Sequence, residues 1–341
     1  MHSYVLSLRD TVKDKETKTL RFSTGLGRPS YLRVPWSTEG SSLPDDEPLP
    51  ADALKDVQTW LRTIVEDAKE GKAPGTEFQV VFFVHGYNTD PKEALKRQRL
   101  AEQELRARGF DCMVIGFDWP TGGTALAYAY DRHEAGQAAG ALVGGAIFPF
   151  ALFSTTSCPI KVHVMAHSMG GYVLREAFRN ADSARMSQIP NDWCIGQVVL
   201  FGADVSSQCF AIGGDMDPVF QHCGRLTNYF SGYDEALAVS NVKNLDISSR
   251  VGRVGMPINK PTNEKAIDVN CGPRYTEVKA RSFAVINGMA SHSWYLEDEV
   301  WYDDLAHTLK GGIDRNVIPT RHPEASGLPD DFVLSIKRQQ P

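Results

Sequence analysis

Residues 161–171 read Lys-Val-His-Val-Met-Ala-His-Ser-Met-Gly-Gly, and this stretch decides the fold. The apolar residues that end at Ala166 predict a buried β-strand, and the two glycines after Ser168 predict a sharp turn into a helix. A turn of this kind strains the backbone of its central residue and holds that side chain above the edge of a sheet. Ser168 is therefore the predicted nucleophile.

The match to the Gly-x-Ser-x-Gly pattern departs at Ala166, where a single methyl group still allows helix and strand to approach closely. A pattern of this length also occurs by chance, and a buried serine in an ordinary turn is the alternative interpretation of Ser168. The remaining parts of the predicted site must decide between the two.

Composition excludes several classes of protein. With 341 residues, 42% hydrophobic and 23% charged, the chain is typical of a globular protein with one large domain or two small ones. The net charge of −6 and the lack of a basic run argue against a nucleic-acid partner. The six cysteines are scattered, so we expect no metal site, and no motif predicts a cofactor. Without a signal-peptide pattern, a cytoplasmic location is expected.

One apolar segment, residues 135–153, carries no charge and repeats glycine every fourth residue from Gly136 to Gly144. Such a repeat is typical of closely packed transmembrane helices. Gln137 and Pro149 interrupt the segment, and it lies between two predicted strands of one sheet. We therefore expect a helix that packs on the sheet or flanks an apolar pocket, and not a membrane span.

The chain alternates between apolar runs and helical patterns. Short strands are expected at 4–8 and 20–23, followed by a helix at 52–70. Buried strands are predicted at 79–84, 112–117, 161–166, 197–201, 226–230 and 283–286. A helix should begin at Asp90, which can cap it, and end before Gly109. This alternation predicts an α/β fold: a mostly parallel sheet covered by helices on both faces, with the functional site at the carboxyl ends of the strands.

The predicted organisation has three parts. Residues 1–75 form an N-terminal extension, residues 76–310 form the catalytic domain, and residues 311–341 form a polar tail on the surface. Within the catalytic domain, residues 239–275 are the predicted insertion or lid.

A nucleophilic serine requires a base and a carboxylate that orients the base. Of the nine histidines, His292 follows the last predicted strand and directly precedes a helix, which suits the base. His222 and His307 remain alternatives. Asp234, after the strand at 226–230, is the preferred acid because it is one strand away from the histidine loop. The alternatives are Asp204, after the strand at 197–201, and Glu235.

Two backbone amides are predicted to hold the oxyanion. One is the N–H of Met169 at the start of a helix, where the helix dipole also favours negative charge. The other is the N–H of Tyr87, because Gly86 allows the preceding loop to turn toward the substrate. Aromatic residues that could shape the substrate pocket are Trp119, Tyr128, Tyr130 and Trp294.

Several short motifs occur in one order along the chain. They are Val84-His85-Gly86-Tyr87-Asn88, Phe117-Asp118-Trp119-Pro120, Tyr130-Asp131-Arg132, Ala166 to Gly171, Tyr233-Asp234-Glu235-Ala236-Leu237 and Ser291-His292-Ser293. With them, residues 79–309 resemble the α/β-hydrolase superfamily, and within it a sparsely characterised bacterial group catalogued as an uncharacterised hydrolase domain. The resemblance implies a triad of Ser168, Asp234 and His292, and it supports Asp234 over Asp204.

The expected activity is hydrolysis of small or aryl carboxylic esters through an acyl-enzyme. The same triad also serves lipases, thioesterases and acyltransferases, and a non-catalytic binding protein could retain the fold. The sequence does not indicate an oligomeric state.

Overall fold

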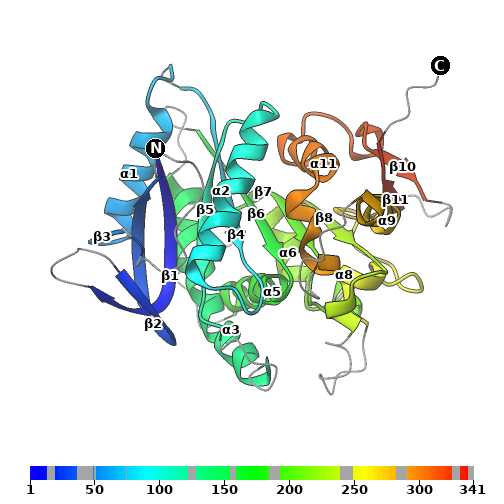
Figure 1. Ribbon diagram of the computed structural model, residues 1–341, viewed down its shortest axis with the longest axis horizontal. Coiled ribbons are helices and arrows are strands. Elements are labelled where there is room, and N and C mark those ends of the chain that lie inside the picture. Colours follow the sequence, from blue (N-terminus) through cyan, green and yellow to red (C-terminus); the bar gives the residue numbers. More distant parts are fainter. Residues whose placement is uncertain are drawn as a thin grey trace.

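The computed structural model describes residues 1–13, 20–36, 49, 51–73, 75–121, 128–153, 159–183, 193–238, 249–281, 290–324 and 331–336. The strands in this part of the chain are β1 (His2–Lys13), β2 (Leu20–Pro35), β3 (Asp52–Leu54), β4 (Phe78–Val84), β5 (Cys112–Asp118), β6 (Ile160–His167), β7 (Ile195–Phe201), β8 (Cys223–Phe230), β9 (Ala266–Asn270), β10 (Arg321–Pro323) and β11 (Asp331–Leu334). They form one 11-stranded sheet in the order β10-β11-β9-β8-β7-β6-β4-β5-β1-β2-β3 (Figure 1).

The central part of the sheet is parallel, from β1 through β5, β4, β6, β7, β8 and β9 to β11. Only the outer pairs, β1 with β2, β2 with β3 and β10 with β11, are antiparallel. The predicted α/β fold with a mostly parallel sheet is thus confirmed. In such a sheet the carboxyl ends of the parallel strands meet at one edge, and the loops that follow β4, β6 and β8 are gathered there.

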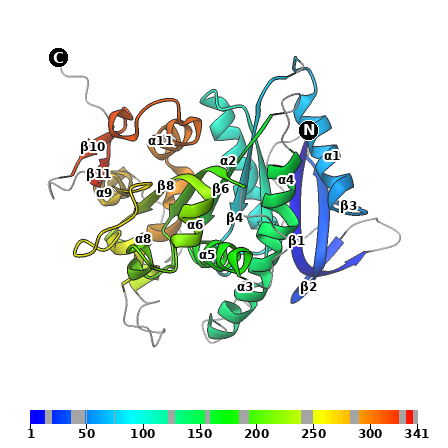
Figure 2. The same ribbon diagram turned by 180° about the vertical axis from the view of Figure 1, so that it is seen from behind.

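Helices cover both faces of the sheet (Figures 1 and 2). They are α1 (Val57–Lys69), α2 (Pro91–Ala107), α3 (Tyr128–Leu142), the π-helical turn η1 (Val143–Ile147), α4 (Phe148–Phe153), α5 (Met169–Asp182), α6 (Asp217–His222), α8 (Val251–Val254), α9 (Gly272–Arg281), α10 (Ala290–Ser293) and α11 (Glu299–Lys310), with 3₁₀ turns at Ser207–Phe210, Trp294–Glu297 and Arg315–Val317.

Strand β4 shows how the sequence separates the two cores. Val80, Phe82 and Val84 pack on one face with apolar residues of α1, α3, α4 and α5. Val81 and Phe83 pack on the other face with residues of α2 and α11. Since successive side chains of a strand point to opposite faces, a strand buried on both faces must be apolar at every position.

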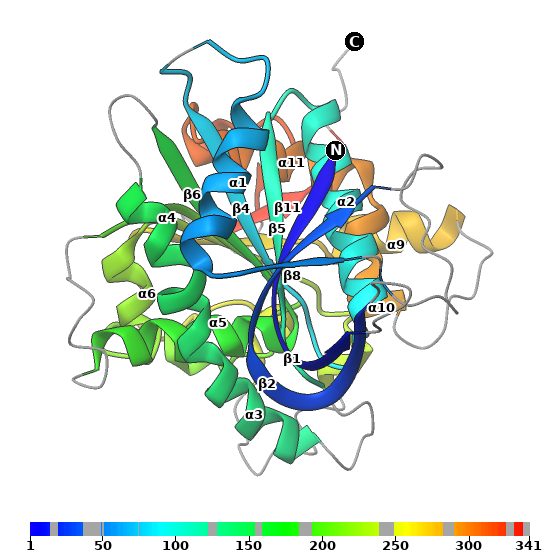
Figure 3. The same cartoon turned by 90° about the vertical axis from the view of Figure 1, so that its left-hand side faces the viewer.

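The N-terminal extension is part of the sheet. Strand β1 lies parallel to β5, and β2 returns beside β1, so that the two strands curl together at the outer side of the sheet (Figure 3). The helix predicted at 52–70 begins only at Val57, because residues 52–54 pair with β2 as strand β3. Asp56 caps α1 by accepting a hydrogen bond from Thr59 N at 2.8 Å.

Two sequence-based assignments need correction. Strand β9 lies within the range predicted as an insertion or lid, 239–275, and pairs with β8 and β11 inside the sheet. Polar residues at Asp268 and Asn270 hid the strand pattern. The predicted surface tail also supplies β10 and β11, and Phe332 and Leu334 of β11 are buried in the second core.

Several other predicted elements are present in the structure. The strands at 79–84, 112–117, 161–166, 197–201 and 226–230 are confirmed, each with slightly wider bounds. Asp90 caps α2, accepting hydrogen bonds from Lys92 N and Glu93 N at 2.9 Å each, and Gly109 has a positive φ of 68° just after the helix. The strand predicted at 283–286 and residues 239–248 of the predicted lid lie outside the described residues.

Among the described residues, the helical run His133–Phe153 is long enough and apolar enough to cross a membrane. Its residues Ala135, Ala139, Leu142 and Phe150 are nevertheless fully buried in the first core. Packing against α5 and the sheet therefore explains the apolar composition of that side of the helix.

Candidate active site

Ser168 occupies the sharp turn between β6 and α5. Its φ of 55° and ψ of −126° lie outside the regions that non-glycine residues favour. The carbonyl oxygen of Ser168 accepts hydrogen bonds from Gly171 N at 3.0 Å and Asp204 N at 2.9 Å, which fixes the strained turn. The predicted nucleophile elbow is therefore present in the backbone geometry.

Glycines allow three segments to meet around this turn. A Cβ atom on Gly170 would collide with the carbonyl oxygen of Val84 and would lie 2.7 Å from that of His85. A Cβ atom on Gly86 would lie 2.7 Å from Cβ of Ser168. The loop after β4, which was predicted to hold the oxyanion, thus lies directly against the serine.

His292 and Asp234 form a buried pair. His292 Nδ1 lies 2.6 Å from Asp234 Oδ2, and the two side chains are 2% and 0% exposed. A carboxylate only accepts, so Nδ1 carries the proton and Nε2 is left as the basic nitrogen. Asp234 is itself held in place, because its Oδ1 accepts a hydrogen bond from Leu237 N at 2.9 Å. The loops of acid and base are also joined, since Glu235 N donates to Ser291 Oγ at 3.2 Å.

His167 connects the turn to α10, the short helix that carries His292. Its Nε2 lies 3.0 Å from the carbonyl oxygen of His292, and the two imidazole rings are 4.6 Å apart between centroids. Burial holds the pKa of His167 well below its usual value, and a positive charge on His292 would lower it further. A neutral His167 can donate its Nε2 proton to that carbonyl oxygen, so the residue directly before Ser168 supports the backbone of His292.

The alternative acid and bases have other partners. Asp204 Oδ1 forms a buried ion pair with Arg250 Nε at 3.2 Å. Its main-chain N–H bonds to Ser168, but the His292 ring faces Asp234 instead. His222 lies between Asp182 Oδ1 and the carbonyl oxygen of Trp193, at 3.0 Å from each. His307 lies in α11, and Glu235 contributes its main-chain N–H to Ser291.

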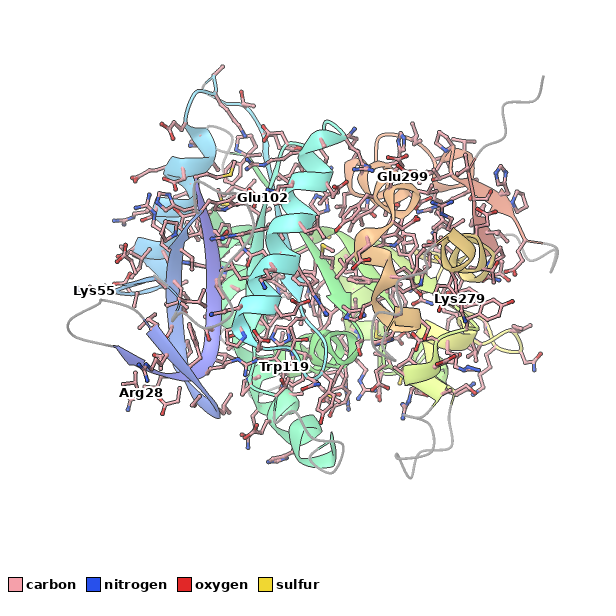
Figure 4. The ribbon with its side chains drawn as sticks, viewed as in Figure 1. Arg28, Lys55, Glu102, Trp119, Lys279 and Glu299 are labelled. Atoms are coloured by element: carbon pink, nitrogen blue, oxygen red, sulfur yellow. The ribbon has the colours of Figure 1, made fainter. Side chains whose placement is uncertain are left out.

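Of the residues predicted to shape the pocket, Trp119 and Trp294 are both buried, at 0% and 6% exposure. Trp119 donates its indole N–H to the carbonyl oxygen of His85 at 2.9 Å, which favours support of the loop over substrate contact. In Figure 4, Trp119 lies at the height of helix α5. Trp294 stacks on Tyr295. The side chains of Tyr128 and Tyr130 lie outside the described part of the structure.

Sequence reasoning missed a buried polar cluster behind the loop after β4. Asp118 accepts hydrogen bonds from Arg9 Nε at 2.8 Å and Ser7 Oγ at 2.7 Å, and its Oδ1 lies 3.2 Å from His85 Nε2. The signal available in the sequence was a titratable residue at the end of each of two strongly apolar strands, His85 directly after β4 and Asp118 at the end of β5. Among the described residues, no group of three or more His, Cys, Asp or Glu side chains could hold a metal ion.

Comparisons with known proteins agree with this architecture. The sequence model of a family described as "Alpha/beta hydrolase of unknown function (DUF900)" matches residues 55–287. An uncharacterized protein of Nostoc sp. (strain PCC 7120) is 40% identical over 60 residues, which are 18% of this chain and only 15% of that relative.

Solved structures with a related chain path share little sequence with this protein. An esterase of the fungus Rhizomucor miehei is 9% identical, with 91% of this chain and 83% of that chain covered at a TM-score of 0.38. A cutinase-like protein from Cryptococcus sp. is 10% identical, with 70% and 96% covered at a TM-score of 0.31.

Proposed function

This chain belongs to the family of alpha/beta hydrolases of unknown function, and from that premise we propose that it hydrolyses carboxylic esters with Ser168 as the nucleophile. The observation that carries the proposal is the buried hydrogen bond of 2.6 Å between His292 and Asp234, joined through His167 to a serine with positive φ. These are the parts that an acyl-transfer serine requires.

In the first half of the reaction, Ser168 Oγ attacks the carbonyl carbon of the ester and His292 Nε2 takes the hydroxyl proton. Asp234 keeps the proton on Nδ1 and stabilises the imidazolium that forms. General-base catalysis of this kind contributes roughly 10²- to 10⁴-fold to the rate. Collapse of the tetrahedral intermediate breaks the bond to the alcohol, which leaves with the proton from His292.

The negative charge on the substrate oxygen would be held by the amides of Tyr87 and Met169. The Met169 amide is at the first position of α5, where the helix dipole favours an anion. The contact between Gly86 and Ser168 brings the Tyr87 segment to the same point. Each such donor lowers the barrier by about 3 kcal/mol.

In the second half, His292 takes a proton from a water molecule, and the resulting hydroxide attacks the acyl-enzyme. The acid is released and Ser168 recovers its proton. Neither half of this reaction requires a metal or an organic cofactor. Small and aryl esters are the proposed substrates, because their leaving groups make the smallest demand on the enzyme.

A fluorophosphonate probe together with a p-nitrophenyl ester series tests this proposal. We expect the wild type to be labelled and to hydrolyse short esters, whereas Ser168→Ala takes no label and loses activity by about 10⁶-fold, as in other serine hydrolases. Ser183→Ala, at the half-buried C-terminal end of α5, serves as the matched control and should behave as wild type. Labelling of Ser168→Ala, or a wild type inactive on the whole series, would contradict the proposal.

A further inference from the structure

The peptide unit between Gly86 and Tyr87 is held by His85. His85 Nδ1 lies 2.8 Å from the carbonyl oxygen of Gly86, and the side chain is 1% exposed. The C=O of one residue and the N–H of the next point in opposite directions across a trans peptide bond, and the described chain has no cis bonds. Fixing the Gly86 carbonyl therefore also fixes the direction of the Tyr87 N–H.

The proton on His85 must be on Nδ1 for this contact to be a hydrogen bond, since the Gly86 carbonyl can only accept. The other ring nitrogen, Nε2, receives the N–H of Trp119 at 3.2 Å and lies beside Asp118. The ring also stacks on Trp119, with 5.5 Å between centroids and 7° between planes. His85 is thus held from both of its edges and from one face.

Asp118 is in turn held by strand β1. Arg9 Nε donates to Asp118 Oδ1, and Arg9 Nη2 reaches the carbonyl oxygen of Thr89 at 2.8 Å, at the far end of the loop. Burial alone would raise the pKa of Asp118, but the charge of Arg9 and the hydrogen bond that Arg9 donates hold that pKa below its usual value.

The irregular backbone of β1 orients the Arg9 side chain. The pairing of β1 with β2 shifts its register on both sides of Arg9, between Ser7 and Arg9 and again between Arg9 and Thr11. Bulges of this kind redirect a side chain within a sheet. Although β1 lies toward the outer side of the sheet, the Arg9 side chain is only 3% exposed.

We infer that Arg9, Asp118 and His85 are positioning residues that aim the Tyr87 amide at the oxyanion. Carbonyl oxygens of His85, Gly86 and Thr89 accept hydrogen bonds from Trp119, His85 and Arg9, so the peptide planes of the loop are set before substrate arrives. The N-terminal strand, which lies outside residues 55–287, is thereby part of the catalytic apparatus. This inference rests on the proposed function.

The test uses the full-length protein and a trifluoromethyl ketone. Ser168 Oγ adds to the ketone carbon, and the resulting hemiketal oxygen occupies the oxyanion position. For Arg9→Gln and Asp118→Asn we expect kcat/KM to fall about 10- to 100-fold, less than the 10²- to 10³-fold lost when a donor is removed outright. Ketone affinity should fall by the same factor, whereas KM for the ester stays nearly constant. Arg9→Lys, which keeps the charge, should recover part of the loss.

Two further variants separate positioning from loss of structure. Trp119→Phe keeps the aromatic stack but removes one hydrogen bond to the loop, so it should fold and lose a few-fold in both kcat and ketone affinity. Arg321→Met breaks a comparable buried Arg–Asp pair with Asp304, away from the loop. It should lower stability but leave kcat unchanged below its unfolding temperature.

The outcomes distinguish the two proposals. If the wild type is active and Ser168→Ala is inactive, but Asp118→Asn, Arg9→Gln and Trp119→Phe keep kcat and ketone affinity within twofold, the positioning role is wrong and the proposed function stands. A loss of activity that only follows the folded fraction, as for Arg321→Met, also overturns the positioning role. A wild type that neither hydrolyses esters nor binds the ketone contradicts the proposed function itself.

Discussion

At the scale of single residues, the site depends on which carboxylate the imidazole faces. Asp234 and Asp204 both follow strands at the active edge, and both are buried. The difference lies in their partners, because Asp234 accepts a hydrogen bond from His292 whereas Asp204 pairs with Arg250. A carboxylate that neutralises a buried guanidinium serves stability, and one that fixes an imidazole tautomer serves catalysis.

Substitution of the two acids by asparagine should therefore give opposite results. Asp234→Asn should lower kcat by about 10⁴-fold, because the amide no longer fixes the imidazole tautomer that catalysis requires. Asp204→Asn should keep kcat within a few-fold but reduce the free energy of unfolding, by up to about 3 kcal/mol, because it weakens a buried ion pair. Ester hydrolysis and urea unfolding measure the two effects. A larger loss of kcat in Asp204→Asn than in Asp234→Asn would reverse the assignment.

At the scale of elements, the sequence predicted what local patterns determine. Strands such as β4, apolar at every position except Gln79, and the capped helix α2 were identified because the signal is contained in the segment itself. Strand β9 was missed because Asp268 and Asn270 interrupt its apolar pattern. These polar residues are accommodated by tertiary contacts, such as the hydrogen bond from Asn228 Nδ2 to Asp268 Oδ1, which no local pattern reveals.

The candidate site shows the same difference between signals within a segment and contacts made only in the folded protein. Chain order was enough to propose Ser168, Asp234 and His292, because Ser168 and Asp234 follow β6 and β8, whose ends lie at the active edge, and His292 comes after both in the order typical of the fold. The contact between Arg9 and Asp118 spans 109 positions and depends on bulges in β1, so it could not be read from either segment.

The C-terminal strands are held to the sheet by a buried network. Arg321 of β10 pairs with Asp304 of α11 at 2.6 Å, and Asp304 also accepts a hydrogen bond from Tyr229 of β8 at 2.6 Å. Burial would raise the pKa of Asp304, but the charge of Arg321 holds it below its usual value. The pair thus joins three elements that are distant in sequence.

Removing the arginine should destabilise the protein strongly. Arg321→Met leaves the Asp304 carboxylate buried beside an apolar chain, and we expect the free energy of unfolding to fall by about 3–5 kcal/mol. Arg179→Met, which removes a partly exposed arginine paired with Glu176, should cost about 1 kcal/mol or less. Urea unfolding at pH 7 compares the two variants. Equal losses would show that the network around Asp304 does not anchor the C-terminal strands.

At the scale of the whole molecule, the sheet is covered unevenly. Beside β9, a cavity of about 400 Å³ opens where no long helix of the described chain packs, and its lining includes Asp268, Asn270, Glu324 and Asp331. Burial raises the pKa of Asp268 to about 7, although hydrogen bonds from Asn228 and from Met256 N favour the carboxylate. The nearby charges of Asp331 and Glu324 contribute to this raised pKa. An acid of this kind makes the stability of the whole fold depend on pH.

The sign of that dependence follows from proton binding in the two states. Between the ordinary pKa of 3.8 and the raised value of about 7, the folded protein holds a proton on Asp268 that the unfolded chain does not. Stability from this group is therefore complete below pH 3.8 and is lost as the pH rises through about 7. Asp268→Asn cannot ionise, so its free energy of unfolding relative to wild type should increase as the pH is raised from about 5 to about 8. Urea unfolding of both proteins across this range measures the difference, in which all other titrating groups cancel. A difference that is constant with pH would mean that Asp268 is ionised in the folded protein throughout, and that its two hydrogen bonds outweigh its burial.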